Sequence, residues 1–253
     1  MNIQTKAKLH PSRLRALLAG VGLFAGMSLV TTTAHATIAY ATITASIGGV
    51  PSSGDVYETF NSVPLGNGTF TTPSGITVSF GGNAQAVTGA ASGLYAAPFL
   101  SGNNGLNFGG QPDGADTTTY LSSGSTGSDS LSEVTLTFAG PTNYLGLLWG
   151  SVDAYNTLTF YNGTTVVGTF TGDDVTSAAN GDQSAQGTYF VNINLSDSFT
   201  SVVATSSQYA FEFDNVAISA DPLKVPEPGT AGVFLLGLLL LGSACWLKGR
   251  QLS

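Results

Sequence analysis

The sequence predicts an all-β fold: a single antiparallel β-sandwich or jelly-roll domain over residues 37–224, flanked by an amino-terminal signal peptide and a carboxy-terminal transmembrane helix. Three observations predict this class. Short runs rich in Thr, Val, Ile, Phe and Tyr recur between clusters of Gly, Asn, Ser and Asp, and no interior segment keeps a helical period beyond a turn or two. An Asn-Gly pair separates two alternating runs, as in a tight β-hairpin. The two ends of the chain, 1–36 and 225–253, differ from the rest in composition.

Residues 1–36 have the three parts of a signal peptide. A basic segment comes first, an apolar stretch follows at residues 16–30, and Ala34-His35-Ala36 then places small residues at the cleavage positions. We expect cleavage before Thr37 and export of the mature protein. A signal anchor is the alternative, and the small residues at 34 and 36 argue against it.

Ten short strands are expected in the domain, enough for two packed sheets. They lie at residues 56–60, 76–80, 117–121, 133–138, 144–149, 157–161, 165–170, 188–195, 201–206 and 210–219. The best-defined pair is the hairpin 156–170. There Leu158 and Phe160 alternate with Thr159 and Tyr161, and Asn162-Gly163 supplies the positive φ angles of a type I′ turn.

Two further segments differ from this alternating pattern. Residues 144–150, YLGLLWG, are apolar at both parities, which predicts a strand buried on both faces in the centre of the sandwich. Between about residues 81 and 130, Gly, Ser, Ala and Asn dominate, which predicts long loops joining short strands. Such loops either carry ligand contacts or are passive connections.

The charge of the domain is one-sided. All seven Lys and Arg and both His lie outside residues 37–223, which contain fourteen Asp and Glu and therefore a formal charge of −14. An anionic surface of this kind repels nucleic acid and anionic lipid, so no nucleic-acid partner is expected. The one cysteine, Cys245, lies in the terminal apolar run, so the domain has no disulfide.

The same composition restricts catalysis. Without His, Cys, Lys or Arg the domain cannot build a Ser-His-Asp triad, a thiolate nucleophile, a Schiff-base lysine or a His-based zinc site. Paired carboxylates, as in glycoside hydrolysis, are the one remaining chemistry. Acids scattered on the loops of an acidic protein are more often solvated surface, so we expect a protein that is not an enzyme.

The carboxy-terminal segment 225–253 has three parts in a fixed order. Pro226-Glu227-Pro228 forms an extended strip, residues 231–247 form an apolar run, and Lys248 and Arg250 follow it. The apolar run is roughly 25 Å long as a helix, a marginal span for a bilayer. The cations after it would stay on the cytoplasmic side.

This segment resembles the PEP-CTERM sorting signal. The resemblance implies that an exosortase recognises Pro226, Glu227 and Pro228 and removes the apolar helix. The protein would be held in the inner membrane transiently, through that helix, and then reach the cell surface or the extracellular space. An ordinary single-span anchor preceded by a chance triplet is the alternative.

Residues 144–161, YLGLLWGSVDAYNTLTFY, resemble the central signature of a family of PEP-CTERM surface proteins, W-G-S-x-D-x-Y-N-x-L. The resemblance covers most of the domain more loosely, and implies only an exported, exosortase-processed β protein. The positions carried over are Trp149, Gly150, Ser151, Asp153, Tyr155 and Asn156. Trp149, Ser151, Asp153, Tyr155 and Asn156 are the ligand-contact candidates. Alternatively, Asp153 and Asn156 bond nearby backbone groups in a tight connection between strands.

Two sets of acids are candidates for calcium. Glu58, in an early strand, and Asp214, in FEFDNVAIS at the end of the domain, have a layout similar to carbohydrate-binding jelly rolls with a structural calcium. The layout predicts that the two approach one another on neighbouring strands. Capped or exposed carboxylates at strand edges are the alternative. Asp173, Asp174 and Asp182 lack the spacing of a calcium loop and indicate solvated turns.

These patterns predict a non-enzymatic exported surface or extracellular-matrix protein processed by an exosortase-type enzyme. The alternative is a glycan-binding β-sandwich stabilised by calcium, with extracellular polysaccharide as its partner. Sugars stack on aromatic rings while a few polar groups fix their orientation. Tyr95, Tyr120 and Tyr155 are the aromatic candidates for such a site.

Overall fold

The computed structural model describes residues 40–52, 54–105, 110–124 and 132–221. The predicted signal peptide, the triplet Pro226, Glu227 and Pro228 and the predicted terminal helix lie outside these residues. Within the described ranges there is no helix that is long and apolar enough to cross a membrane.

The all-β prediction is confirmed for the described residues, which contain only one four-residue helix, α1 (Gly172–Val175), and one 3-10 turn, η1 (Ala185–Gly187). The strands in chain order are β1 (Ala41–Ser46), β2 (Val56–Glu58), β3 (Thr69–Thr71), β4 (Thr77–Gly81), β5 (Gln85–Val87), β6 (Phe99–Leu100), β7 (Gly114–Ala115), β8 (Tyr120–Gly124), β9 (Ser132–Gly150), β10 (Asn156–Asn162), β11 (Thr165–Thr171), β12 (Tyr189–Ser206) and β13 (Tyr209–Ser219). All the strand pairings between them are antiparallel.

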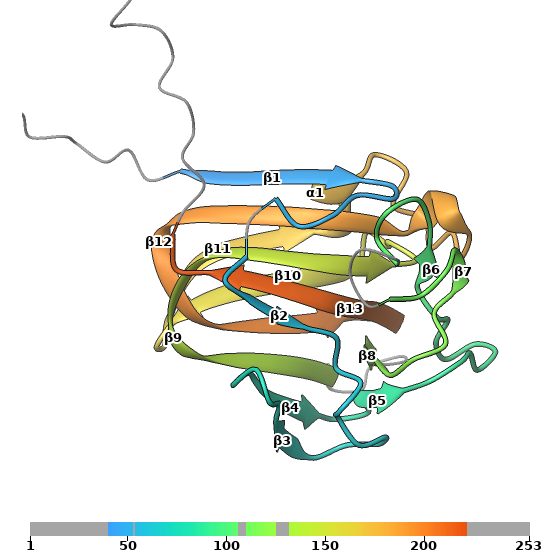
Figure 1. Ribbon diagram of the computed structural model, residues 1–253, viewed down its shortest axis with the longest axis horizontal. Helices are drawn as coiled ribbons and strands as arrows, with labels where there is room; N and C mark the ends of the chain where they lie inside the picture. The colour runs from blue at the N-terminus through green and yellow to red at the C-terminus, as the bar shows by residue number, and fades with distance from the viewer. Residues whose placement is uncertain (1–39, 53, 106–109, 125–131, 222–253) are drawn as a thin grey trace, which may run out of the picture. The chain divides into compact units, whose positions relative to one another are not determined.

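Eleven strands are joined in one hydrogen-bonded sheet (Figure 1). Its main order is β11-β10-β12-β9-β13-β8-β5, with β1 beside β12, β2 beside β13, β4 beside β9 and β3 beside β4. The predicted hairpin is confirmed as β10 and β11, but its type I′ turn at Asn162-Gly163 is not. Asn162 is the last residue of β10, pairs with Thr165 and has no positive φ, so the two-residue loop is Gly163-Thr164, with Gly163 at φ 61°.

The two longest strands, β9 and β12, carry the sheet through two layers. Residues 132–137 of β9 pair with β4 and with the end of β12, whereas residues 144–150 pair with β13 and with the start of β12. The β9–β12 register shifts between these halves, near Asn194 and Phe199. We call the half with β3, β4, β10 and β11 the first layer and the half with β1, β8 and β13 the second layer.

This arrangement corrects the predicted strand list. The strands predicted at 133–138 and 144–149 are the two halves of β9, and those at 188–195 and 201–206 are the two halves of β12. Gly140 and Pro141, between the two predicted strands, lie exposed within one continuous strand, where Pro is tolerated. The short strands β1, β3, β5, β6 and β7 were not predicted, because two to six residues give too little periodicity. The jelly-roll connectivity stays a prediction.

Burial of YLGLLWG on both faces is confirmed. Leu145, Leu147 and Trp149 belong to the main core, together with Leu136 and its neighbours from the first layer. On the opposite face, Tyr144 and Leu148 form a second cluster with Leu100, Phe190 and Ala217. The second layer is therefore covered on its outer face as well.

The cover is the Gly- and Ser-rich connection between β5 and β8, here called the covering segment (residues 88–119). Leu100 packs into the second cluster, and the Phe99 backbone N–H donates to Thr188 Oγ1 at 3.0 Å. Pro98 lies against Gly150 so closely that a Cβ on that glycine would come within 3.0 Å of the Pro98 Cα. In the described part of the covering segment, Pro98, Phe99 and Leu100 thus pack against the second layer.

Candidate functional site

A pocket of about 480 Å³ opens where β9 ends and β10 begins. Its walls come from residues 151–155, from the start of the covering segment, from residues 180–183 and from the start of β13. The side chains that give it chemical character are Tyr95, Ser151, Asp153, Tyr155, Tyr209 and Glu212. We call it the tyrosine–carboxylate pocket.

Three of the five predicted ligand contacts, Ser151, Asp153 and Tyr155, line this pocket. The other two, Trp149 and Asn156, are fully buried (0% exposed) and do not line it. Trp149 stacks on Phe211 in the main core at a centroid distance of 4.4 Å. Asn156 Oδ1 accepts a 2.8 Å hydrogen bond from Ser206 Oγ. Their burial contradicts a ligand contact for either, so the two residues support the site from below.

The turn that presents Asp153 is tight. Its backbone carbonyl accepts the Asn156 N–H at 3.1 Å, and it forms a β-bridge with Asn180. Gly181, at φ 71°, lies so close that an added Cβ would meet Asp153 Oδ2 at 2.7 Å. A glycine at 181 is therefore required for the carboxylate to fit beneath the bridge.

Tyr155 holds the Asp153 side chain in place. Its hydroxyl donates to Asp153 Oδ2 at 2.5 Å, with the carbonyl oxygen of Tyr209 at 3.2 Å. Burial raises the pKa of Asp153 above its usual value, while the hydrogen bond from Tyr155 opposes that rise. Burial, and then the bond to Asp153, raises the pKa of Tyr155, so the phenol stays protonated.

Glu212 lies deeper in the same pocket and is 2% exposed. Its Oε2 accepts from Ser151 Oγ at 2.7 Å, and its Oε1 accepts from the Ala96 backbone N–H at 2.8 Å. Burial raises the pKa of Glu212 to about 7, although both hydrogen bonds favour the charged form. The site therefore combines one carboxylate near the surface with one at its base.

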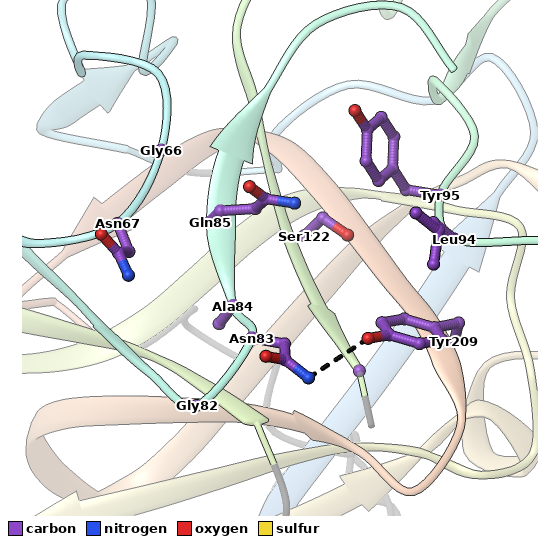
Figure 2. A pocket seen from close by; sticks show the side chains of 11 residues that line it. Gly66, Asn67, Gly82, Asn83, Ala84, Gln85, Leu94, Tyr95, Ser122 and Tyr209 are labelled. Carbon is purple, nitrogen blue, oxygen red and sulfur yellow. Dashed lines mark hydrogen bonds between the residues drawn. The ribbon is translucent and has the colours of Figure 1, made fainter. Parts of the chain in front are cut away.

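A second pocket, of about 370 Å³, adjoins the first. Figure 2 shows the side chains that line it. Leu94, Tyr95 and Tyr209 line both, so these three side chains form a ridge between the two hollows. Beyond the ridge the lining is uncharged, with the amides Asn67, Asn83 and Gln85 and the hydroxyl of Ser122. Asn83 Nδ2 donates to Tyr209 Oη at 3.2 Å, which ties the ridge to the wall of this amide pocket.

The predicted aromatic candidates divide. Tyr95 and Tyr155 are partly exposed in the tyrosine–carboxylate pocket, whereas Tyr120 is fully buried and cannot stack on a sugar. Tyr120 instead contacts Tyr95 edge to face at a centroid distance of 6.4 Å. Its hydroxyl donates to the Gly89 carbonyl, so it anchors the covering segment from beneath.

The structure places the two acids of the predicted calcium site on neighbouring strands, but it does not show them in a common ligand set. Glu58 and Asp214 lie on neighbouring strands, since β2 pairs with β13 and Glu58 is opposite Val216. Glu58 accepts hydrogen bonds from the Phe60 N–H at 2.7 Å and from Ser74 Oγ at 2.6 Å. Asp214 is fully buried, and neither carboxylate oxygen has a hydrogen-bond partner. Among the described residues, no group of three or more His, Cys, Asp and Glu side chains surrounds one point.

The acids after β11 serve local structure. Asp174 Oδ2 accepts the Thr171 N–H at 2.7 Å at the start of α1, and Asp182 Oδ1 accepts the Ser184 N–H at 2.8 Å. The backbone and side-chain hydrogen bonds of Ser184 lower the pKa of Asp182. These contacts agree with the predicted solvated turns.

Sequence reasoning missed Tyr209 and Glu212 as site residues. A signal for Glu212 was present in FEFDNVAIS, where Phe211 and Phe213 occupy one parity of a strand and Glu212 and Asp214 the other. In a strand covered on both faces, such acids must be buried. The covering of the second face could not be read from the Gly-rich composition of the covering segment.

No family model matches the chain, and no curated protein matches it. Among solved structures, the K2 cleaved adhesin domain of Lys-gingipain is similar over 64% of this chain and 98% of that one, with 12% identity and a TM-score of 0.37. The enzymatically active domain of tailspike protein 4 from bacteriophage CBA120 is similar over 64% of this chain and 22% of its own, with 13% identity and a TM-score of 0.31. Likenesses of this size establish no relationship in fold or function.

Proposed function

We propose that this chain is an exported, non-enzymatic surface or extracellular-matrix protein whose jelly-roll domain binds a glycan in the tyrosine–carboxylate pocket. The observation that carries the proposal is the convergence of three tyrosines, two serines and two carboxylates on one open pocket. They come from segments as far apart in the sequence as Tyr95 and Glu212, so the fold, and not local sequence, assembles the site.

The composition of the pocket suits a sugar. The partly exposed rings of Tyr95, Tyr155 and Tyr209 offer apolar surface, and Ser151 and Asp153 offer groups that bond hydroxyls. The amide pocket beyond the ridge of Leu94, Tyr95 and Tyr209 continues this polar lining. A chain of sugar units could therefore contact both hollows by crossing the ridge.

Binding fits the carboxylates better than hydrolysis does. A glycosidase needs one carboxylic acid and one carboxylate free to act on opposite sides of the scissile bond. Here Glu212 accepts bonds from Ser151 and Ala96, and Asp153 accepts one from Tyr155, so both are engaged by the pocket wall. Such carboxylates orient a ligand through remaining lone pairs and do not need to exchange protons with it.

The test is glycan binding by the purified full-length chain in detergent, against neutral and acidic oligosaccharides, followed by calorimetry on any hit. Tyr95→Ala should weaken binding about tenfold, which corresponds to ~1.4 kcal/mol of lost contact. Tyr161→Ala is the matched control, because Tyr161 is a partly exposed tyrosine of the β10–β11 hairpin that lines neither pocket. Equal loss in both variants, or no binding to any glycan, would overturn the assignment of this pocket.

The sorting part of the proposal rests on residues 225–253 and is tested separately. The intact mass of the protein from the cell surface should correspond to a chain that begins at Thr37 and ends near Pro226-Glu227-Pro228. Replacing the triplet by three alanines should leave the apolar run attached. A surface protein that retains residues 231–247 would contradict exosortase processing.

A further inference from the structure

Asp116, in the covering segment, has a carboxylate with two unlike oxygens. Its Oδ1 accepts three hydrogen bonds, from Gln111 Nε2 at 2.8 Å and from the backbone N–H and the hydroxyl of Thr118 at 2.8 and 2.7 Å. Its Oδ2 is buried and has no hydrogen-bond partner. The loop therefore fixes the orientation of the carboxylate and leaves its second oxygen without a donor beside the Asp214 side chain.

Asp214 and Asn215, on β13, are in the same situation. Both are buried (0% and 1% exposed), and all four side-chain oxygen and nitrogen atoms lack hydrogen-bond partners. Asn215 has a positive φ of 51°, and the β13–β9 register shifts between Asp214 and Ala217. A β-bulge that contains a residue in the left-handed conformation and two consecutive buried polar side chains without hydrogen bonds destabilises the folded state unless a bound ligand compensates it.

Asp116 lies over the face of the sheet that carries Asp214. Its backbone N–H donates to the Pro98 carbonyl at 2.9 Å, and Pro98 packs on Gly150 of β9. In the pairing of β13 with β9, Asp214 lies opposite Leu148. Leu148 is two residues before Gly150 in β9, so these positions share the outer face of the second layer. The side chains of Asp116 and Asp214 contact one another directly, so the two carboxylates meet in the interior.

No cationic side chain is present to compensate this pair, because residues 37–223 contain no Lys, Arg or His. An unpaired buried carboxylate costs several kcal/mol, and two together cost more. A bound metal cation supplies the missing charge. The donors are carboxylate and amide oxygens, which suit a hard ion such as Ca²⁺ and not the thiophilic or imidazole-binding metals.

We propose that Asp116, Asp214 and Asn215 bind one calcium ion between the covering segment and β13, independently of glycan binding. This set differs from the Glu58–Asp214 pair expected from the sequence. Glu58 keeps its bonds to Phe60 and Ser74, and contributes negative charge from the neighbouring strand. The ion ties the covering segment, and with it the Tyr95 wall of the pocket, to the second layer.

The experiment compares thermal unfolding of the full-length chain in detergent, in EGTA and in millimolar Ca²⁺, with calcium stoichiometry measured by equilibrium dialysis. The wild type should bind one ion per chain at this site and unfold several degrees higher in Ca²⁺ than in EGTA. Mg²⁺ at the same concentration should give a smaller shift, because it dehydrates reluctantly.

The order of the unfolding temperatures of Asp214→Asn and the wild type should differ between EGTA and Ca²⁺. In EGTA the variant should unfold at or above the wild-type temperature, because it removes a buried charge that nothing compensates; in Ca²⁺ it should unfold below the wild type and bind one ion fewer. Asp197→Asn, which removes an exposed acid, is the control and should follow the wild type in both.

Absence of any calcium shift in the wild type would overturn the proposal even if Asp214→Asn fails to fold. A variant destabilised equally in EGTA and Ca²⁺ would assign Asp214 a purely structural role and would also overturn it. A proton shared by Asp116 and Asp214 in place of the ion predicts no calcium effect and a wild type that loses stability as pH rises.

Discussion

The hydroxyl of Tyr155 is the contact that fixes the shape of the tyrosine–carboxylate pocket, and Tyr155→Phe removes it with almost no change in volume. The substitution removes the 2.5 Å hydrogen bond to Asp153 Oδ2 and the longer contact to the Tyr209 carbonyl oxygen. Hydrogen bonds to charged acceptors contribute about 1.5–3 kcal/mol. Because Tyr155 is partly exposed and water can replace it, we take the lower end, about 1.5 kcal/mol. For a domain of this size that corresponds to a fall in Tm of about 3–6 °C.

The assay is thermal unfolding at pH 4 and pH 7, with Tyr161→Phe as the control. The hydroxyl of Tyr161 makes no hydrogen bond within the described part of the chain, so this variant should match the wild type. Since the Tyr155 bond favours the charged form of Asp153, the difference between Tyr155→Phe and wild type should grow as pH rises and Asp153 ionises. A Tyr155→Phe protein with the Tm of the control at both pH values would refute the role given to this hydroxyl.

Two other substitutions test the core and the electrostatics. Leu147→Ala should cost about 2–5 kcal/mol in denaturant unfolding, because Leu147 is buried in the main core; Val166→Ala, at a position 53% exposed on β11, should change stability little, and equal losses would contradict the core assignment. Asp153→Asn should gain stability relative to wild type as pH rises from 3.8 towards neutrality. The folded pKa of Asp153 is raised, so the wild type loses stability over the window in which the unfolded chain ionises first. A difference in Tm that is constant with pH would show that Asp153 titrates normally.

The strands that the sequence predicted well are those whose hydrophobic pattern is long enough to allow only one interpretation. The β10–β11 hairpin follows from the alternation on both sides of its turn, although the loop is Gly163-Thr164 and not the predicted Asn162-Gly163. The burial of 144–150 on both faces follows from seven nearly continuous apolar residues. The continuity of β9 and β12 could not be predicted. A bend in one strand and a loop between two strands share the same local signal, exposed Gly140 and Pro141, and only pairing across the sheet distinguishes them.

The sequence predicted the site residues that are close together in the chain, but not those that strand pairing brings in from a distant part of the chain. The pocket residues that the sequence predicted, Ser151, Asp153 and Tyr155, lie within five positions of one another. The same signature also gave Trp149 and Asn156 as ligand contacts, but the side chains of these two residues are buried in the interior. Tyr209 and Glu212 reach the pocket from the other end of the domain through strand pairing. Such neighbours depend on sheet order, which composition and periodicity do not determine.

The absence of cations from residues 37–223 constrains the buried acids of the domain, whose surroundings are of three kinds. Asp153 accepts a hydrogen bond from a phenol, Glu58 and Glu212 each accept one hydroxyl and one backbone amide, and the Asp116–Asp214 pair has no donor for its facing oxygens. The same absence decides which glycans suit the pocket. With no Lys or Arg to pair a uronate or sulfate, and with Asp153 and Glu212 in the wall, an acidic polysaccharide would bring like charges together in a partly desolvated site. The charge pattern therefore favours neutral sugars over acidic ones, and an acidic glycan binding more tightly than its neutral counterpart would place the contact outside this pocket.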